Sequence, residues 1–169
     1  VYPKKSYLMQ LKNHKLVDNP QVLKKLCAGY TTTEKKIIMT NGCFDIIHSG
    51  HVHILSEAKK MGDVLIVAMN SDESVVKNKG NNRPINNEIE RAFVLSSLTM
   101  VDHIIIFNDT TPERLICTIL PDVLVKGADY ENKRIAGRDC LEKNGKKVAL
   151  VSLLEGKSTS KIIQKLDDI

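Results

Sequence analysis

The sequence is poor in aromatic residues and contains no tryptophan. Aromatic side chains make up 4% of the 169 residues, so few are available to stack on the bases of a nucleic acid. Lysine and arginine are spread along the chain and form no basic block. These absences argue against a nucleic acid as the ligand, whereas the net charge of +5 suits small phosphorylated molecules.

Long hydrophobic runs are also missing. No stretch reaches the length needed to span a membrane, and residues 1–15 lack the apolar centre and cleavage site of a signal peptide. The four cysteines form no CxxC pair, which indicates neither a zinc knuckle nor a disulfide framework. We therefore predict a soluble protein with no membrane partner, in a reducing, cytoplasmic setting.

The chain contains five short runs in which nearly every residue is apolar. Such runs are typical of strands buried on both faces of a parallel sheet. Between them, apolar residues recur at helical spacing after Gly50, Asn86 is placed to cap a helix, and Thr111 precedes a Pro–Glu helix start. The alternation predicts an α/β fold, a doubly wound, Rossmann-like parallel sheet of about five strands. The runs lie at residues 36–40, 63–69, 102–107, 122–125 and 147–153.

Residues 1–34 stand apart from this alternation, and we interpret them as an N-terminal extension. They include a predicted short helix from Pro20 to Ala28 that Gly29 would end. Residues 35–169 then form the domain that carries the sheet, with a length usual for one domain. The sequence starts with valine and not methionine, which leaves excision from a longer polypeptide open.

Three histidines lie in the stretch NGCFDIIHSGHVHIL, directly after the first predicted strand. In such sheets, ligands bind at the turns that follow the strands. His48 and His51 flank the start of the next helix, where free N–H groups attract anions, and Gly50 lets a phosphate approach the backbone. His53 points to nearly the opposite side and is interpreted as a structural or surface residue. A metal site formed with Cys43 is the rival interpretation, but it lacks a clear fourth ligand.

The residues NGCFD…HSGH resemble the HxGH signature of the nucleotidyltransferase superfamily, whose two histidines hold a nucleoside triphosphate. The stretches NSDESVVKNKGNNRPINNEIER, PDVLVKGADY and EGKSTSKII follow in the order and at the spacing of the bacterial ADP-heptose synthases. The resemblance covers residues 35–166. It implies transfer of AMP from ATP to D-glycero-β-D-manno-heptose 1-phosphate, with release of pyrophosphate.

The resemblance also implies a cofactor and partners. Mg²⁺ is expected to arrive with ATP, and no metal ligand is assigned to the protein. The family often fuses this domain to a sugar kinase and often forms dimers, so a kinase partner and a homodimer are further expectations. Such an enzyme works in the bacterial cytoplasm.

The resemblance implies which residues form the site. His48, His51 and Lys126 take the catalytic roles, and Asp72 is assigned to the sugar. Residues assigned to the nucleotide and its phosphates are Gly42, Phe44, Asp45, Gly50, Lys79, Arg83, Arg91, Gly127, Asp129, Tyr130, Ser158, Thr159 and Ser160.

Several of these residues have plainer interpretations, which the sequence leaves open. Asp72 and Ser158 suit helix caps, Arg91 suits an exposed charge on a helix, and Phe44 suits the core. Asp45 either orients a histidine or bonds the sugar. The cations of the KNKGNNRP segment belong either to a lid over the ligand or to a solvated loop.

One departure separates this sequence from similar cytidylyltransferases, which carry Arg-Thr-Glu-Gly-Ile-Ser-Thr near the C-terminus. The corresponding segment reads LLEGKST, with Leu153 in place of the arginine and Lys157 as a partial replacement for its charge. Two alternatives therefore stay open. One is a cytidylyltransferase for a polyol or amino-alcohol phosphate, and the other is a nucleotide-binding module without catalytic activity.

Overall fold

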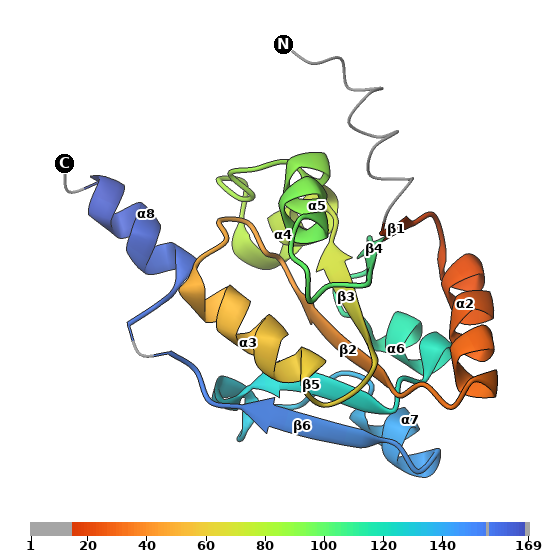
Figure 1. Ribbon diagram of the computed structural model, residues 1–169. Helices are drawn as coiled ribbons and strands as arrows, with labels where there is room; N and C mark the ends of the chain where they lie inside the picture. The colour runs from red at the N-terminus through yellow and green to blue at the C-terminus, as the bar shows by residue number, and fades with distance from the viewer. Residues whose placement is uncertain (1–14, 155, 168–169) are drawn as a thin grey trace.

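The described residues form one parallel sheet with the strand order β1-β4-β3-β2-β5-β6 (Figure 1). The computed structural model describes residues 15–154 and 156–167. The predicted doubly wound α/β fold is confirmed, with six strands in place of about five. The strands are β1 (Leu16–Val17), β2 (Ile37–Gly42), β3 (Val64–Asn70), β4 (His103–Phe107), β5 (Val123–Gly127) and β6 (Lys147–Val151).

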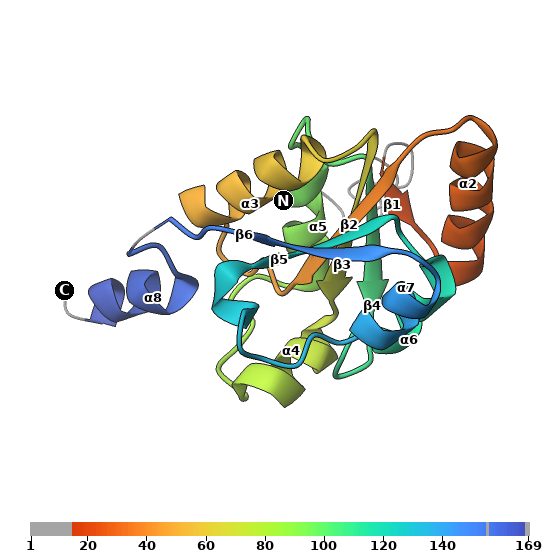
Figure 2. The same cartoon turned by 90° about the horizontal axis from the view of Figure 1, so that it is seen from below.

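Helices cover both faces of this sheet. In Figure 2, α3 and α5 lie on one side, and α6 and α7 lie on the other. All seven residues of β3 are buried as a result, which explains why its sequence is an unbroken apolar run. The helices are α2 (Pro20–Thr32), α3 (Ser49–Lys59), α4 (Asp72–Lys79), α5 (Glu88–Ser96), α6 (Glu113–Ile119), α7 (Arg138–Lys143) and α8 (Thr159–Asp167), with a 3₁₀ turn, η1 (Ala128–Tyr130).

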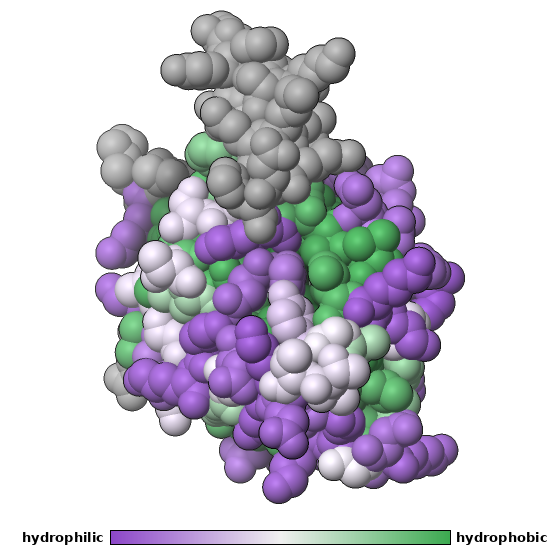
Figure 3. Space-filling model, turned by 45° about the vertical axis from the view of Figure 1, so that its right-hand side comes forward, coloured by the Kyte–Doolittle hydropathy of each residue, from purple (hydrophilic) through white to green (hydrophobic). Residues whose placement is uncertain are grey.

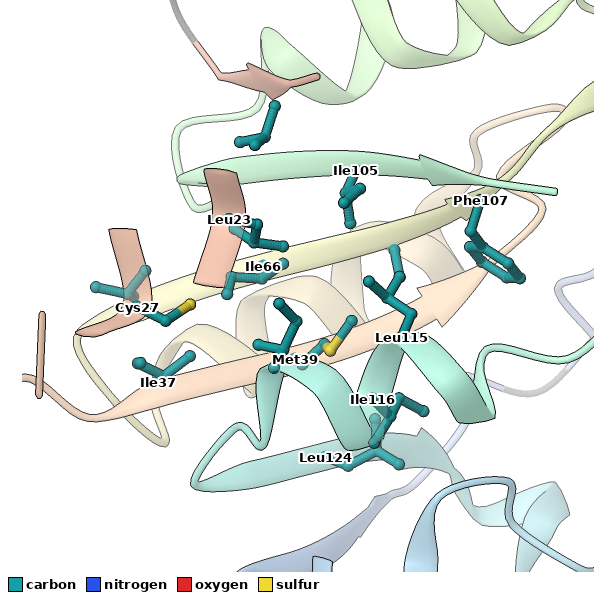
Figure 4. Packing of buried hydrophobic residues seen from close by; sticks show 14 of the residues in the cluster. Leu23, Cys27, Ile37, Met39, Ile66, Ile105, Phe107, Leu115, Ile116 and Leu124 are labelled. Carbon is teal, nitrogen blue, oxygen red and sulfur yellow. The ribbon is translucent and has the colours of Figure 1, made fainter. Parts of the chain in front are cut away.

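The helix α2 is part of the core. Figure 4 shows Leu23 and Cys27 of this helix facing the sheet residues Ile66 and Met39. The strand β1 pairs with β4 and adds the sixth strand. Within the segment predicted to be an extension, residues 15–32 therefore pack on the sheet, and residues 1–14 lie outside the described part of the chain. Figure 3 turns the side of the molecule that carries α2 toward the viewer, and hydrophobic and hydrophilic residues lie next to one another on this surface.

Two predicted helix caps are wrong, and a third helix starts as predicted but without a capping bond. The helix α2 continues through Gly29 to Thr32, because burial of its apolar face outweighs a glycine cost of about 1 kcal/mol. Asn87 caps α5, since Asn86 instead bonds the backbone carbonyl and the carboxylate of Asp45. The helix α6 begins at Glu113 without a side-chain cap, so the expected start signal at Thr111 gives no capping bond.

The cysteine prediction is wrong for one pair. Cys117 of α6 and Cys140 of α7 form a disulfide, with their Cα atoms 5.8 Å apart. They are separated by 23 positions, so no local spacing marks them, and only the packing of α6 beside α7 brings them together. Cys27 and Cys43 carry free thiols.

The helix α8 extends away from the sheet, and its first turn lies near the first turn of α3 (Figure 1). Thr159 Oγ1 lies 3.5 Å from the carbonyl oxygen of Ile46, which precedes α3. Among the described helices, none is long and apolar enough to cross a membrane.

Candidate active site

A pocket of about 640 Å³ lies at the carboxyl edge of the sheet, where β2, β3 and β5 end. Its volume is in the range usual for small-molecule sites. The sequence predicted half of its lining. The predicted residues that line it are Gly42, Phe44, Asp45, His48, Gly50, His51, Lys79, Arg83, Lys126, Asp129, Tyr130, Ser158, Thr159 and Ser160.

The two histidines are held by the backbone at the start of α3. His48 caps the helix, and its Nδ1 accepts a bond of 3.1 Å from the N–H of Gly50. Nδ1 of His51 accepts a bond of 3.4 Å from the N–H of His48, which completes a capping box. A backbone N–H can only donate, so both Nδ1 atoms are unprotonated. In the neutral rings, each Nε2 therefore carries the proton and can donate to a phosphate oxygen.

Both imidazoles favour the neutral form. Burial, with a smaller contribution from the neighbouring His48, lowers the pKa of His51 to about 4. Burial also lowers the pKa of His48, with a smaller contribution from the charge of Lys157. The ring centroids lie 3.9 Å apart, so two charged rings would repel strongly. The free protein thus presents two neutral N–H donors at this position.

Lys126 is the buried cation of the pocket. Its Nζ lies 3.2 Å from Oδ1 of Asn41 and 4.0 Å from the centre of the Tyr130 ring. Burial lowers its pKa to about 8, although the carboxylate of Asp129 acts in the opposite direction. The ammonium therefore gains an anionic ligand at little further desolvation cost, which suits a phosphate.

Asp45 does not bond a histidine. Its carboxylate accepts a bond of 2.6 Å from Nε of Arg83 and bonds from the N–H groups of Ile85 and Asn86. Burial alone would raise its pKa, but these bonds lower it below the usual value. Asp45 is thus a positioning residue that fixes the segment carrying Arg83 over the pocket. This contact favours the lid interpretation of that segment.

Arg91 and Asp72 lie outside the pocket lining. The guanidinium of Arg91 is buried, at 1% exposed, and donates to the carbonyl oxygens of Cys43 and Asn70. It also forms an ion pair of 2.7 Å with Asp72. Both interpretations of Arg91 from the sequence, a phosphate contact and an exposed helix charge, are therefore wrong. Arg91 instead links the ends of β2 and β3 through its hydrogen bonds. Ser71, and not Asp72, caps α4.

Gly127 supports the pocket without lining it. A Cβ at this position would lie 2.6 Å from Oδ1 of Asp129 and 2.8 Å from Cδ2 of Leu153. A larger residue at this position would push aside the ends of the Asp129 and Leu153 side chains, which lie in the loops that follow β5 and β6.

The N-termini of α3 and α8 converge on the same wall of the pocket. Ser158 Oγ accepts a bond of 3.2 Å from the N–H of Lys161, so it has the capping role that the sequence left open. Lys157 and Gly50 are close, since a Cβ on Gly50 would lie 3.4 Å from Cβ of Lys157. Two helix N-termini, two imidazole donors and one lysine make this wall suited to a polyphosphate.

The structure adds lining residues that sequence reasoning missed. Asn41 and Asn70 lie at the ends of β2 and β3. Because ligands bind at the carboxyl ends of parallel strands, this position could have predicted both residues. The far part of the pocket also contains Asn78, Thr110, Thr111, Pro112, Arg134 and Ile135. No local motif marks these residues. Among the described residues, no group of three or more His, Cys, Asp and Glu side chains could hold a metal ion.

Comparison with known proteins places this site in a family. The cytidylyltransferase-like family profile matches residues 39–165, which include the histidines, Lys126 and the first turn of α8. The chain belongs to the cytidylyltransferase-like family. A solved structure of similar sequence is the lipopolysaccharide core biosynthesis protein of Thermoplasma volcanium, 31% identical with a TM-score of 0.58, which the chain matches over 73% of its own length and 99% of that protein.

Curated relatives of this cytidylyltransferase-like chain are longer. It is 46% identical to the bifunctional protein HldE of Campylobacter jejuni over 94% of its length and 34% of that protein. It is 51% identical to the HldE protein of Campylobacter curvus over 80% of its length and 28% of that protein. The chain thus spans about a third of the length of these relatives. Pantoate–β-alanine ligase of Francisella tularensis shares the fold, with a TM-score of 0.63 at 14% identity over 92% of this chain and 78% of the ligase.

Proposed function

We propose that this chain is an adenylyltransferase that transfers AMP from ATP to a sugar 1-phosphate. The acceptor we favour is D-glycero-β-D-manno-heptose 1-phosphate, which gives ADP-heptose and pyrophosphate. The observation that carries the proposal is the pair of neutral Nε2–H donors of His48 and His51, placed where α3 and α8 begin. High identity to the HldE proteins supports the choice of acceptor.

The reaction needs positioning and charge neutralisation more than proton transfer. An oxygen of the acceptor phosphate bonds to the α-phosphorus of ATP, and the bond from that phosphorus to the bridging oxygen of pyrophosphate breaks. A phosphate monoester is mostly dianionic near neutrality, with a second pKa of about 6, so no general base is required. In this proposal His48 and His51 donate to the α- and β-phosphates, and Lys126 neutralises charge that develops at the reaction centre.

Mg²⁺ is proposed to enter with ATP. Of the pocket carboxylates, Asp45 is fully engaged with Arg83 and two backbone N–H groups, and Asp129 lies 3.3 Å from the ammonium of Lys133. This donor set suits an ion held mainly by phosphate oxygens and water. When bound, the ion supplies neutralisation of the triphosphate charge.

The partners and the cellular location of this protein are proposed from its relatives and from the family resemblance. The curated relatives are called bifunctional and are about three times as long as this chain, which supports a sugar kinase as fusion or working partner. A bacterial cytoplasmic location and a homodimer are proposed on the family resemblance. In a reducing cytoplasm the Cys117–Cys140 pair would be held as two thiols, and mass spectrometry after alkylation in cell lysates tests this.

The test is pyrophosphate release by the purified chain with Mg²⁺, with ATP and CTP each paired with the heptose 1-phosphate and with glycerol 3-phosphate. We expect rapid release only with ATP and the heptose phosphate. Release with CTP would favour a cytidylyltransferase and overturn the proposed substrates. Nucleotide binding without release in any pairing would favour the non-catalytic module.

A further inference from the structure

The far part of the pocket is unused by the histidines and the helix N-termini. Six residues, called here the acceptor arm, line it: Asn78, Thr110, Thr111, Pro112, Arg134 and Ile135. They come from the last turn of α4, from the turn that leads into α6, and from the segment between η1 and α7. In Figure 2 these elements lie on the side of the sheet opposite α3.

The in-line geometry of phosphoryl transfer indicates which substrate the acceptor arm would bind. The attacking and leaving oxygens lie on opposite sides of the phosphorus. Pyrophosphate, the more highly charged group, belongs at the N-termini of α3 and α8, which share one wall of the pocket with Lys157. The nucleophile must then approach from the other side, where the acceptor arm lies.

We infer that the acceptor arm binds the hydroxyl-bearing carbons of the acceptor sugar phosphate. This inference rests on the proposed function and names the subsite of its second substrate. It also replaces the assignment of the sugar to Asp72, whose carboxylate forms an ion pair with Arg91 and does not line the pocket.

The chemistry of the arm suits a polyol. The hydroxyls of Thr110 and Thr111 form no hydrogen bond with any residue in the described part of the chain and are free to bond a ligand. Asn78 uses Nδ2 to bond the carbonyl oxygen of Thr110 at 3.0 Å, which ties α4 to this turn and leaves its Oδ1 as an acceptor. Neutral donors and acceptors of this kind bind sugar hydroxyls, with Pro112 available to the apolar faces of the carbon chain.

Arg134 is the cation of the arm. Its side chain is 82% exposed and lies 3.7 Å from a carboxylate oxygen of Glu113, a pairing too weak to hold it in place. It is therefore able to turn toward a ligand and donate to several hydroxyl oxygens.

The nucleotide base is the competing occupant of the arm. Bases bind well against aromatic faces, and the aromatic residues of the pocket are Phe44 and Tyr130, which are outside the arm. All six residues of the arm are non-aromatic. This composition favours a saturated sugar over a base.

The test compares KM for each substrate in variants that leave the fold intact. Thr111→Val removes a hydroxyl without changing the shape, and Arg134→Gln removes the cation. Thr118→Val on α6 is the matched control, because its hydroxyl bonds only the carbonyl oxygen of Arg114 and lies outside the pocket. Thr111→Ser, which retains the hydroxyl, is the rescue variant.

We expect Thr111→Val and Arg134→Gln to raise KM for the heptose 1-phosphate about fivefold to tenfold. KM for ATP and kcat should change by less than about twofold, because the arm makes no contact with the reacting phosphorus. Thr118→Val should match the unmodified chain in every constant, and Thr111→Ser should bring KM for the heptose 1-phosphate back toward the unmodified value. Thermal midpoints for all four variants should agree within about 3 °C, as usual for exposed positions.

Three outcomes would count against the inference. A rise in KM for ATP alone would assign the arm to the nucleotide. Unchanged constants in both variants would show that the arm binds neither substrate. In both cases the proposed function would stand, since the unmodified chain still turns over. Absence of turnover by the unmodified chain with every sugar phosphate would overturn the proposed function and this inference together.

Discussion

The imidazole rings of His48 and His51 lie 3.9 Å apart between centroids, and each accepts a backbone N–H bond at Nδ1. The start of α3 therefore fixes the position, the tautomer and the protonation state of both rings at once. The same bonds cap the helix and prepare two donors for a phosphate. The structural role of these residues and their proposed catalytic role coincide, and a suitable substitution separates them.

His48→Asn is the substitution that separates the two roles. Asparagine is a good helix cap, so the bond to the N–H of Gly50 is retained, whereas the distal N–H donor is lost. We expect kcat to fall about 100-fold to 1000-fold, as for removal of one donor to a transition-state oxyanion, with little change in thermal midpoint. Steady-state pyrophosphate release and a thermal melt check both parts.

His53→Asn is the control for that variant. His53 bonds the carbonyl oxygen of Ser152 on the exposed surface and does not line the pocket, in agreement with its interpretation as a structural or surface residue. Its kcat should stay within about twofold of the unmodified chain. Near-normal turnover of His48→Asn would refute the assigned role of the imidazole.

Lys126 should produce an alkaline limb in the pH profile. Its pKa in the free protein is lowered to about 8, so the ammonium is present below that pH and is lost above it. We expect kcat/KM for ATP, which reports the free enzyme, to fall as pH rises through 8. Lys126→Arg keeps its charge throughout this range and should move the limb upward. An unchanged limb in that variant would assign the titration to another group.

Gly50→Ala should disturb the histidines and spare the fold. The added Cβ would lie 2.9 Å from Cε1 and 3.0 Å from Nδ1 of His48, so the ring must move from its cap position. We expect kcat/KM for ATP to fall at least about tenfold, because a displaced donor no longer meets the phosphate. Gly29→Ala in the middle of α2 is the control, since its Cβ meets nothing within 4 Å. That variant should keep full activity and gain up to about 1 kcal/mol of stability.

Arg91→Met should lower the free energy of unfolding by about 3–5 kcal/mol. The change leaves Asp72 and the carbonyl oxygens of Cys43 and Asn70 without their buried donor. Arg114→Met is the matched control, because the Arg114 side chain is 84% exposed and its ion pair with Asp109 is worth at most about 1 kcal/mol. Urea titrations measure both. Equal effects of the two changes would contradict the structural role of Arg91.

Much of the fold could be predicted because its signals are local. Buried strands such as β3 read as continuous apolar runs, and the helix after Gly50 shows its period directly. The strand β1 could not be predicted in this way, because a strand of two residues is too short to show a hydrophobic pattern. It forms only by pairing with β4, where Leu16 lies opposite Ile104, far away in the sequence. The end of α2 was missed because Tyr30, directly after the glycine, packs against the core and places its hydroxyl 2.7 Å from Nε2 of His103, and these contacts are between residues far apart in the chain.

The sequence by itself determined the α/β class, the turn that carries His48 and His51 before α3, and the position of Lys126 at the carboxyl end of β5, since each follows from residues close in the chain. Tertiary structure alone decided the rest. Tertiary contacts make Asp45 and Arg91 positioning residues and bring Cys117 and Cys140 within bonding distance. They also bring together the three segments that form the acceptor arm. The physical reason is that such contacts depend on which strand ends and loops become neighbours once the sheet has formed. The spacing of residues along the chain does not determine these neighbours.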